Sequence, residues 1–148
     1  CCSSASHSKA LPAAANEQLG FRHPLNSDWD HLSFCQFAGP LEKKDGTLTG
    51  SNAVAIRPGE IDSCPTGTGC SARMVLLHAQ GKVGIGETSR TRSIIGSEFV
   101  CGITSKTTVG DRSGIVPTVS GRAWITETKH LLLDPSDPWQ EGYRLSDT

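Results

Sequence analysis

The apolar run that follows a tight polar loop in DSCPTGTGCSARMVLLHAQG, residues 62–81, constrains the fold of this chain most strongly. The pattern predicts a helix over residues 70–80, ended by Gly81. Its apolar side chains point to nearly every side of the helix: Ala72, Met74, Val75, Leu76, Leu77 and Ala79. A helix that is apolar all round has to be surrounded by other elements rather than laid on a surface.

The rest of the sequence predicts short strands that can surround this helix. Candidate strands lie at residues 31–37, 52–57, 82–85, 92–95, 98–104, 107–109, 115–119, 122–128 and 131–133. A short helix is expected over residues 13–20, and residues 39–50 are expected to form a Gly-rich solvated excursion. We therefore expect an α+β fold in which a rolled antiparallel sheet, closed or nearly closed, wraps around a central helix, because closure hides strand edges.

Length and composition limit the possible partners. A chain of 148 residues is the length of one domain, and residues 1–12, rich in Ser and Ala, are expected to be a poorly ordered lead-in. The net charge of −1 with scattered Lys and Arg argues against nucleic acid. The longest apolar stretch, residues 74–77, is far shorter than the roughly 20 residues that span a bilayer, so no membrane partner is expected. The six cysteines show no regular spacing, which favours free thiols in a reducing cytoplasm.

Glycine and threonine residues lie where the predicted helix begins. Gly67, Thr68 and Gly69 stand where the first unpaired N–H groups can point at a ligand, and a helix start carries about half a positive charge. Glycine allows close approach of the backbone, and threonine adds hydroxyl groups. We expect an anion site here, able to hold a carboxylate or phosphate without Lys or Arg. The alternative is that Thr66 or Thr68 only caps the helix.

Two other interpretations of this loop fit less well. Residues 67–72 match G-x-G-x-x-G/A, and Glu87 lies about 20 residues further on, as in dinucleotide-binding folds. However, residues 62–66 separate the glycines from the preceding strand, and the following elements alternate β with β. Cys64, Cys70 and His78 lack the usual spacing of zinc ligands, so we expect no bound metal.

The stretch DSCPTGTGCSAR resembles the second signature of the proline racemase family, which reads approximately D-R-S-P-C-G-T-G-T-S-A and aligns with residues 62–72. The resemblance covers most of the chain from about Asn16 onward. It continues, in the same order, through NAVAIRPGEID, ARMVLLHAQGKVGIGE, RSIIGSEFVCGI, GRAWIT and LDPSDPWQEGYRL.

The resemblance implies an enzyme that needs no cofactor, neither PLP nor metal, and acts at the α-carbon of proline or hydroxyproline. Its fold would be a lobe like those of diaminopimelate epimerase. The carboxylate of the imino acid would lie between two helix N-termini, one of them formed by Gly67, Thr68 and Gly69. Asp62 matches a family position near the ring nitrogen of the substrate, where a carboxylate favours the ammonium form. Thr66 matches the position of a catalytic cysteine.

Threonine at position 66 decides which reaction the resemblance implies. Inversion at the α-carbon uses two groups, one on each face, and a threonine hydroxyl is far too weak an acid to replace the cysteine thiol. Relatives with threonine here resemble trans-3-hydroxy-L-proline dehydratases, in which one base suffices. Proline racemisation or 4-hydroxyproline epimerisation is the alternative. Cys64 and Cys70 could each be proposed as a displaced base, but we expect them to pack instead.

The family's first cysteine lies in a motif resembling Met-Cys-Gly-His, which this sequence lacks. We therefore expect residues 13–148 to be the C-terminal lobe, with the N-terminal lobe missing, and this fragment to be inactive by itself. A separated lobe exposes apolar surface, so we expect a homo-oligomer. A third possibility is a non-catalytic remnant that binds an imino acid or only itself.

Overall fold

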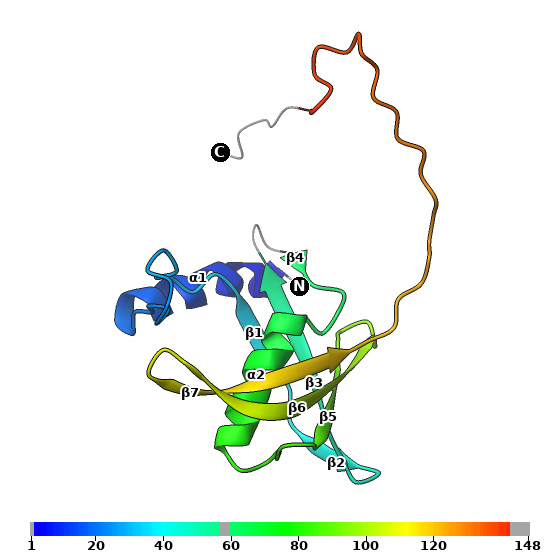
Figure 1. The fold of residues 1–148 in the computed structure, drawn as a ribbon. Coiled ribbons are helices and arrows are strands. Elements are labelled where there is room, and N and C mark those ends of the chain that lie inside the picture. The colour runs from blue at the N-terminus through cyan, green and yellow to red at the C-terminus, as the bar shows by residue number, and fades with distance from the viewer. Residues whose placement is uncertain (1, 57–59, 143–148) are drawn as a thin grey trace.

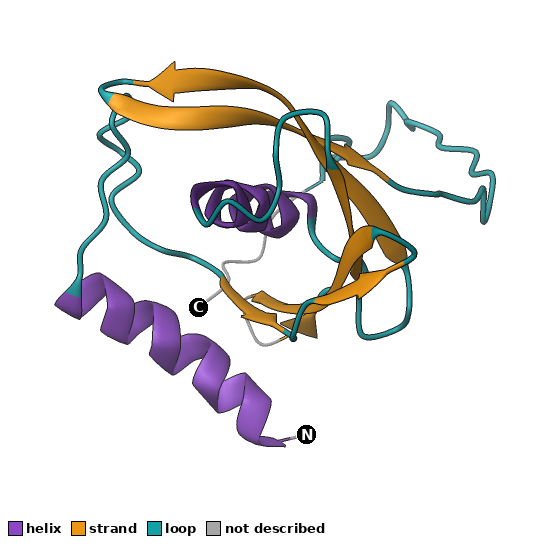
Figure 2. Ribbon diagram, turned by 90° about the horizontal axis from the view of Figure 1, so that it is seen from below, coloured by secondary structure: helices purple, strands orange, loops and turns teal. Residues whose placement is uncertain are grey.

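The computed structural model describes residues 2–56 and 60–142 and has the mixed α+β architecture expected from the sequence. Within these residues, two helices, α1 (Cys2–Gln18) and α2 (Gly67–Ala79), accompany one sheet of seven strands. The strands are β1 (Cys35–Ala38), β2 (Glu42–Lys44), β3 (Thr47–Ile56), β4 (Glu60–Ile61), β5 (Thr88–Arg92), β6 (Glu98–Val109) and β7 (Arg112–Ser120). Figure 2 shows the strands curving around α2, which lies inside the curl.

The sheet has the strand order β1-β3-β5-β6-β7, and β2 and β4 also pair with β3. The described pairs are antiparallel except β3 and β5, which run parallel from Leu48 opposite Ser89 to Ser51 opposite Arg92. Parallel neighbours need a long crossover, and here the connection contains β4 and α2. The expected antiparallel, rolled sheet is therefore confirmed with one parallel pair, and it is not closed, since β1 and β7 end the strand order.

A tight hairpin joins β2 to β3. Asp45 and Gly46 form its two-residue loop with φ angles of 50° and 78°, as a type I′ turn requires. Glu42–Lys44 pairs with Thr47, Leu48 and Thr49, so the expectation of a solvated excursion over residues 39–50 is wrong for these strands. The charged side chains of β2 are nonetheless exposed, so backbone pairing with β3 and not side-chain burial orders this segment.

The core lies between one side of α2 and the sheet. The buried side chains of this core are Cys70, Met74 and Leu77 of α2 together with Val83, Cys101 and Ile103. On another side of α2, Val75 is 44% exposed and Leu76 is 56% exposed. The expectation that the helix is surrounded on every side is therefore wrong, because the open sheet leaves this side of α2 uncovered.

The first helix is longer than expected. α1 spans Cys2–Gln18, so the predicted lead-in is helical from residue 2 onward, where we expected little order. Alanine is the strongest helix former, and the segment is rich in it. Asn16 fixes the end of α1: its side chain donates to the carbonyl of Leu32 (3.0 Å) and accepts the Leu32 N–H (2.7 Å).

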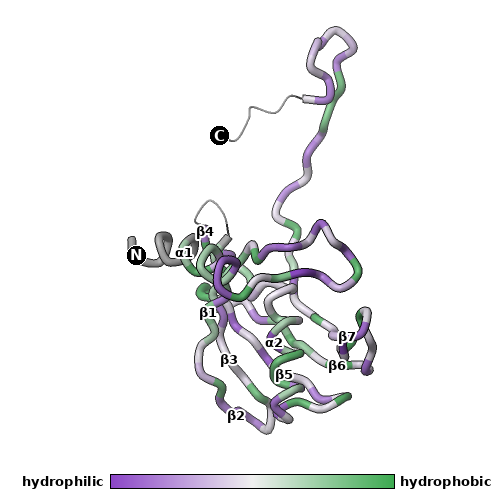
Figure 3. The backbone as a smooth tube through the Cα atoms, turned by 90° about the vertical axis from the view of Figure 1, so that its left-hand side faces the viewer, coloured by the Kyte–Doolittle hydropathy of each residue, from purple (hydrophilic) through white to green (hydrophobic). Residues whose placement is uncertain are grey.

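The C-terminal arm, residues 121–142, leaves the sheet after β7 (Figure 1). The strands predicted at 122–128 and 131–133 are absent from the structure, and Ile125 is 94% exposed. Apolar stretches therefore lie along the arm without burial (Figure 3). The strands predicted at 82–85 and 92–95 are also wrong: β5 lies mainly between them, and bends and turns occupy most of those residues.

Cys1 and Arg57, which belong to predicted segments, lie outside the described residues. Neither of the two described helices is both long enough and apolar enough to cross a membrane.

Candidate functional site

The side chain of Asp62 organises the loop between β4 and α2. One carboxylate oxygen, Oδ1, accepts the N–H of Cys64 (3.1 Å), and the other, Oδ2, accepts the hydroxyl hydrogen of Thr66 (2.6 Å). The N–H of Thr66 donates to the Cys64 sulfur (3.3 Å). Together these bonds hold Thr66 at φ 63°, a left-handed conformation that is uncommon for a β-branched residue. The Thr66 hydroxyl is thus fixed against a carboxylate.

Helix α2 begins without a side-chain cap. Thr66 occupies the N-cap position, but its hydroxyl is bonded to Asp62 and makes no capping hydrogen bond. Within the described chain, the N–H groups of Gly67, Thr68 and Gly69 have no hydrogen-bond partner. Such free donors, at the positive end of a helix, suit an anion. The geometry therefore argues against simple capping of the helix by Thr66.

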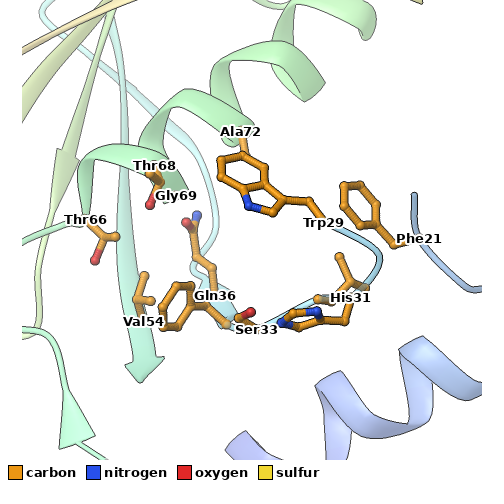
Figure 4. A pocket seen from close by; sticks show the side chains of 12 residues that line it. Phe21, Trp29, His31, Ser33, Gln36, Val54, Thr66, Thr68, Gly69 and Ala72 are labelled. Carbon is orange, nitrogen blue, oxygen red and sulfur yellow. The ribbon is translucent and has the colours of Figure 1, made fainter. Parts of the chain in front are cut away.

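A hollow of about 500 Å³ opens beside these donors. Figure 4 shows Gln36 and Val54 on one side of it, with α2 residues above them and Trp29 across from them. Apart from the polar groups on α2, the wall is mostly aromatic and aliphatic. The lining residues are Phe21, Trp29, His31, Leu32, Ser33, Phe34, Gln36, Val54, Thr66, Thr68, Gly69 and Ala72.

The structure brings together part of the predicted set. Thr66, Thr68 and Gly69 line the hollow, whereas Asp62 and Gly67 are not among its lining residues. Asp62 reaches the hollow only through its hydrogen bond to Thr66. Gly67 is the first residue of α2, and its carbonyl accepts the Ser71 hydroxyl hydrogen (2.9 Å).

Asp62 is stabilised as a carboxylate. The hydrogen bond from the Thr66 hydroxyl, followed by that from the Cys64 N–H, lowers the pKa of Asp62 below its ordinary value. A hydroxyl that donates to a carboxylate keeps its lone pairs free, so Thr66 can accept a hydrogen bond from a ligand. Near neutral pH the loop therefore carries a fixed negative charge directly behind Thr66.

The cysteines near the loop have different surroundings. Cys70 is buried, and its thiol donates to the carbonyl of Pro65 (3.4 Å). A hydrogen bond with Cys101 is the main reason that the pKa of Cys70 is lowered, and the same bond raises the pKa of Cys101. Desolvation raises the pKa of Cys64. Neither Cys64 nor Cys70 lines the hollow, and Cys70 is buried whereas Cys64 is partly exposed.

Arg73 connects α2 to the strands beneath it. This buried guanidinium donates to the carbonyls of Ser51 (2.9 Å) and Gly39 (2.9 Å) and to the side-chain oxygen of Asn52. The position of the helix start relative to β1 and β3 is therefore fixed by hydrogen bonds one turn further along α2.

Sequence reasoning missed the wall opposite α2. His31 lies in the hollow with Phe21, Trp29 and Gln36. No local motif could have identified them, since they reach α2 only through tertiary packing. His78, by contrast, has a structural role, because its Nδ1 lies 2.9 Å from the carbonyl oxygen of Val83. Among the described residues, no group of three His, Cys, Asp or Glu side chains could hold a metal ion.

The chain matches one family model and is similar to solved structures. The family model described as proline racemase matches residues 4–144. A hydroxyproline epimerase from Agrobacterium vitis, solved with bound trans-4-hydroxy-L-proline, is 32% identical, with a TM-score of 0.73 over 97% of this chain and 40% of that one. A probable proline racemase from Agrobacterium radiobacter, solved with bound carbonate, is 33% identical, with a TM-score of 0.71 over 99% of this chain and 43% of that one. The chain thus spans less than half the length of either solved relative.

Proposed function

This chain belongs to the proline racemase family, and on that premise we propose that it is the C-terminal lobe of an enzyme that removes water from trans-3-hydroxy-L-proline. The observation that carries this proposal is the position of Thr66. It stands where the family signature has cysteine, and it lines the hollow with Thr68 and Gly69. Its hydroxyl is bound to Asp62 at 2.6 Å.

The proposed binding mode places the substrate carboxylate on the free N–H groups at the start of α2. The pyrrolidine ring then lies toward the apolar wall of the hollow. The negative charge of Asp62, one hydrogen bond behind Thr66, favours a protonated ring nitrogen. A positive nitrogen beside the α-carbon stabilises the carbanion character that develops when the α-proton leaves.

The proposed reaction is an elimination. A base takes the α-proton, and the electron pair of that C–H bond forms the C2–C3 double bond while the C–O bond of the 3-hydroxyl breaks. The departing hydroxyl takes the proton back from the base and leaves as water. The enamine product, Δ2-pyrroline-2-carboxylate, tautomerises to the imine. A thiolate is the base that the family pattern supplies, and it comes from the Met-Cys-Gly-His motif that these 148 residues lack. Thr66 supplies a hydrogen bond that orients the leaving hydroxyl, and we expect the 148-residue chain alone to be inactive.

The test uses the polypeptide encoded by the complete gene beside the 148-residue chain. Each is incubated with trans-3-hydroxy-L-proline, trans-4-hydroxy-L-proline and L-proline in deuterium oxide and followed by proton NMR. We expect the gene product to convert only the 3-hydroxy compound, yielding the cyclic imine. Inversion with deuterium uptake at the α-carbon, without imine, would refute the dehydratase assignment.

Epimerisation of 4-hydroxyproline is the second candidate, and the Agrobacterium vitis relative with its bound trans-4-hydroxy-L-proline favours it. That reaction needs a second proton donor on the opposite face of the α-carbon. The described residues that line the hollow include no cysteine, which supports elimination over inversion.

We further propose that this chain associates with copies of itself and that it is located in a reducing compartment. Val75 and Leu76 on α2 and the apolar residues of the C-terminal arm are exposed, which favours contact with another apolar surface. Cys35, Cys64, Cys70 and Cys101 are free thiols, which supports a cytoplasmic location.

A further inference from the structure

Gln36 lies at the boundary between two hollows. It is the second residue of β1 and lies opposite Val54 of β3, so both side chains project from one face of the sheet. Together with Gly69 and Ala72, Gln36 lines both the 500 Å³ hollow and a second one of about 620 Å³ that continues along α2 toward Leu76. The side chain thus reaches from the sheet to the first turn of the helix (Figure 4).

The contact between Gln36 and Gly69 is close. The carboxamide oxygen of Gln36 would clash with a β-carbon on residue 69, and its Cδ is 3.1 Å from the position of that β-carbon. Glycine is therefore required at position 69 for this approach. The contact sets the carboxamide beside Gly69, one of the residues with an unpaired N–H group at the start of α2.

The carboxamide of Gln36 has no hydrogen-bond partner within the described chain. Asn52, on the neighbouring strand, is a useful contrast: it is buried, its Nδ2 donates to the carbonyl of Pro65 (3.5 Å), and its oxygen accepts from Arg73. The Asn52 side-chain amide is therefore fully used in hydrogen bonds that stabilise the fold. The Gln36 side-chain amide offers two free N–H donors to the hollow.

We propose that Gln36 is a substrate-binding residue whose Nε2 donates a hydrogen bond to the carboxylate of the ligand held at the start of α2. This inference rests on the proposed function, which places that carboxylate there. A carboxylate has about four lone-pair sites, and the helix N–H groups approach it from one side only. Gln36 approaches from β1 and fixes the plane of the carboxylate.

The rest of the hollow defines the ligand class. Phe21, Trp29, Phe34 and Val54 offer apolar surface and no further positive charge. A small ring with one carboxylate fits this arrangement, since its ring lies against the apolar wall while the carboxylate meets donors from both α2 and β1. No Lys or Arg side chain is among the lining residues, so a second anionic group on the ring would meet no permanent positive charge there.

The test measures binding of pyrrole-2-carboxylate, a planar analogue of the imino acid, to the 148-residue chain at neutral pH by NMR titration. Gln36→Glu keeps the shape of the side chain but replaces the donor with a negative charge. We expect it to weaken binding at least tenfold. Gln36→Met, which removes the donor without adding charge, should weaken binding a few-fold. Gln140→Glu, in the exposed arm, is the matched control and should bind as the unaltered chain does.

The side-chain NH₂ signals of Gln36 in the unaltered chain give a readout that needs no variant. Shifts of these signals together with the Thr68 and Gly69 amide signals support the inference. Shifts of the Thr68 and Gly69 amides alone, with normal binding by Gln36→Glu, overturn the role of Gln36 and leave the anion site intact. No shift at any of these groups overturns the carboxylate site itself, and the role of Gln36 with it.

Discussion

Thr66 gives its hydroxyl hydrogen to the Asp62 carboxylate across 2.6 Å, although Thr66 stands where its hydroxyl could have capped α2. The bond leaves the first N–H groups of the helix unpaired and holds Thr66 in a left-handed conformation. One side-chain pair therefore accounts for both the charge and the open donors of the candidate site.

The stability of the fold should depend on pH through Asp62. Because the pKa of Asp62 is lowered in the folded chain, its contribution is present above the unfolded pKa of about 3.9 and is lost as the pH falls through the folded pKa. Urea unfolding between pH 2 and pH 7 should show a weaker loss of stability on acidification for Asp62→Asn than for the unaltered chain. Asp111→Asn, in the exposed β6–β7 turn, controls for the loss of one charge. Identical acid dependence of Asp62→Asn and the unaltered chain would contradict the prediction.

Thr66→Cys should change the reaction of the complete gene product. A thiol has a free pKa of about 8.5 and can return a proton to the second face of the α-carbon. We expect epimerised hydroxyproline to increase and the imine product to decrease, measured by proton NMR in deuterium oxide. Thr66→Ser, which retains a hydroxyl, should still favour the imine. An unchanged product ratio in Thr66→Cys would count against the role of this position.

The two glycines at the start of α2 should respond differently to alanine. Nothing lies within 4 Å of a β-carbon on residue 67, whereas one on residue 69 meets the Gln36 carboxamide. Gly67→Ala should be neutral or raise the free energy of unfolding by up to about 1 kcal/mol, since alanine favours the helix. Gly69→Ala should lose part or all of that gain, because the end of the Gln36 side chain has to move aside. Urea unfolding of the pair checks this, and equal effects would disprove the close contact.

Loss of the Arg73 guanidinium should destabilise the chain. Arg73→Met leaves the carbonyl oxygens of Ser51 and Gly39 and the side chain of Asn52 without this donor, so the free energy of unfolding should fall by about 3 kcal/mol. Arg90→Met removes an arginine that pairs with Glu98 at the surface and should cost less than about 1 kcal/mol. A similar cost for both variants would mean that the Arg73 contacts do not hold α2 in place.

Self-association should depend on the uncovered side of α2. Leu76 is 56% exposed, and Leu76→Lys places a charge in that apolar surface. Light scattering should show a smaller mass for this variant than for the unaltered chain. Ile94→Lys, an equally exposed site in the β5–β6 turn, should leave the mass unchanged. A monomeric mass for the unaltered chain would remove the basis for the prediction.

Local patterns predicted the elements that depend on neighbouring residues. The helix at residues 70–80 was found because its apolar run ends at a glycine, although α2 begins earlier, at Gly67. The alternation at residues 98–104 marked β6 correctly, and the 107–109 segment proved to be its continuation. The Asp45-Gly46 hairpin was missed although its turn signal was present, because the charged residues before it suggested only a solvated loop.

The sequence by itself determined the family, the glycine-rich segment where α2 begins and the threonine at position 66, because a signature is written in adjacent residues. Only the tertiary structure decided that β3 and β5 run parallel, that Leu76 is exposed, and that Gln36 and Trp29 complete the hollow. These features depend on which distant segments pack together. Which segments pack together is decided by how the whole chain buries its apolar surface, so no short stretch of sequence can predict it.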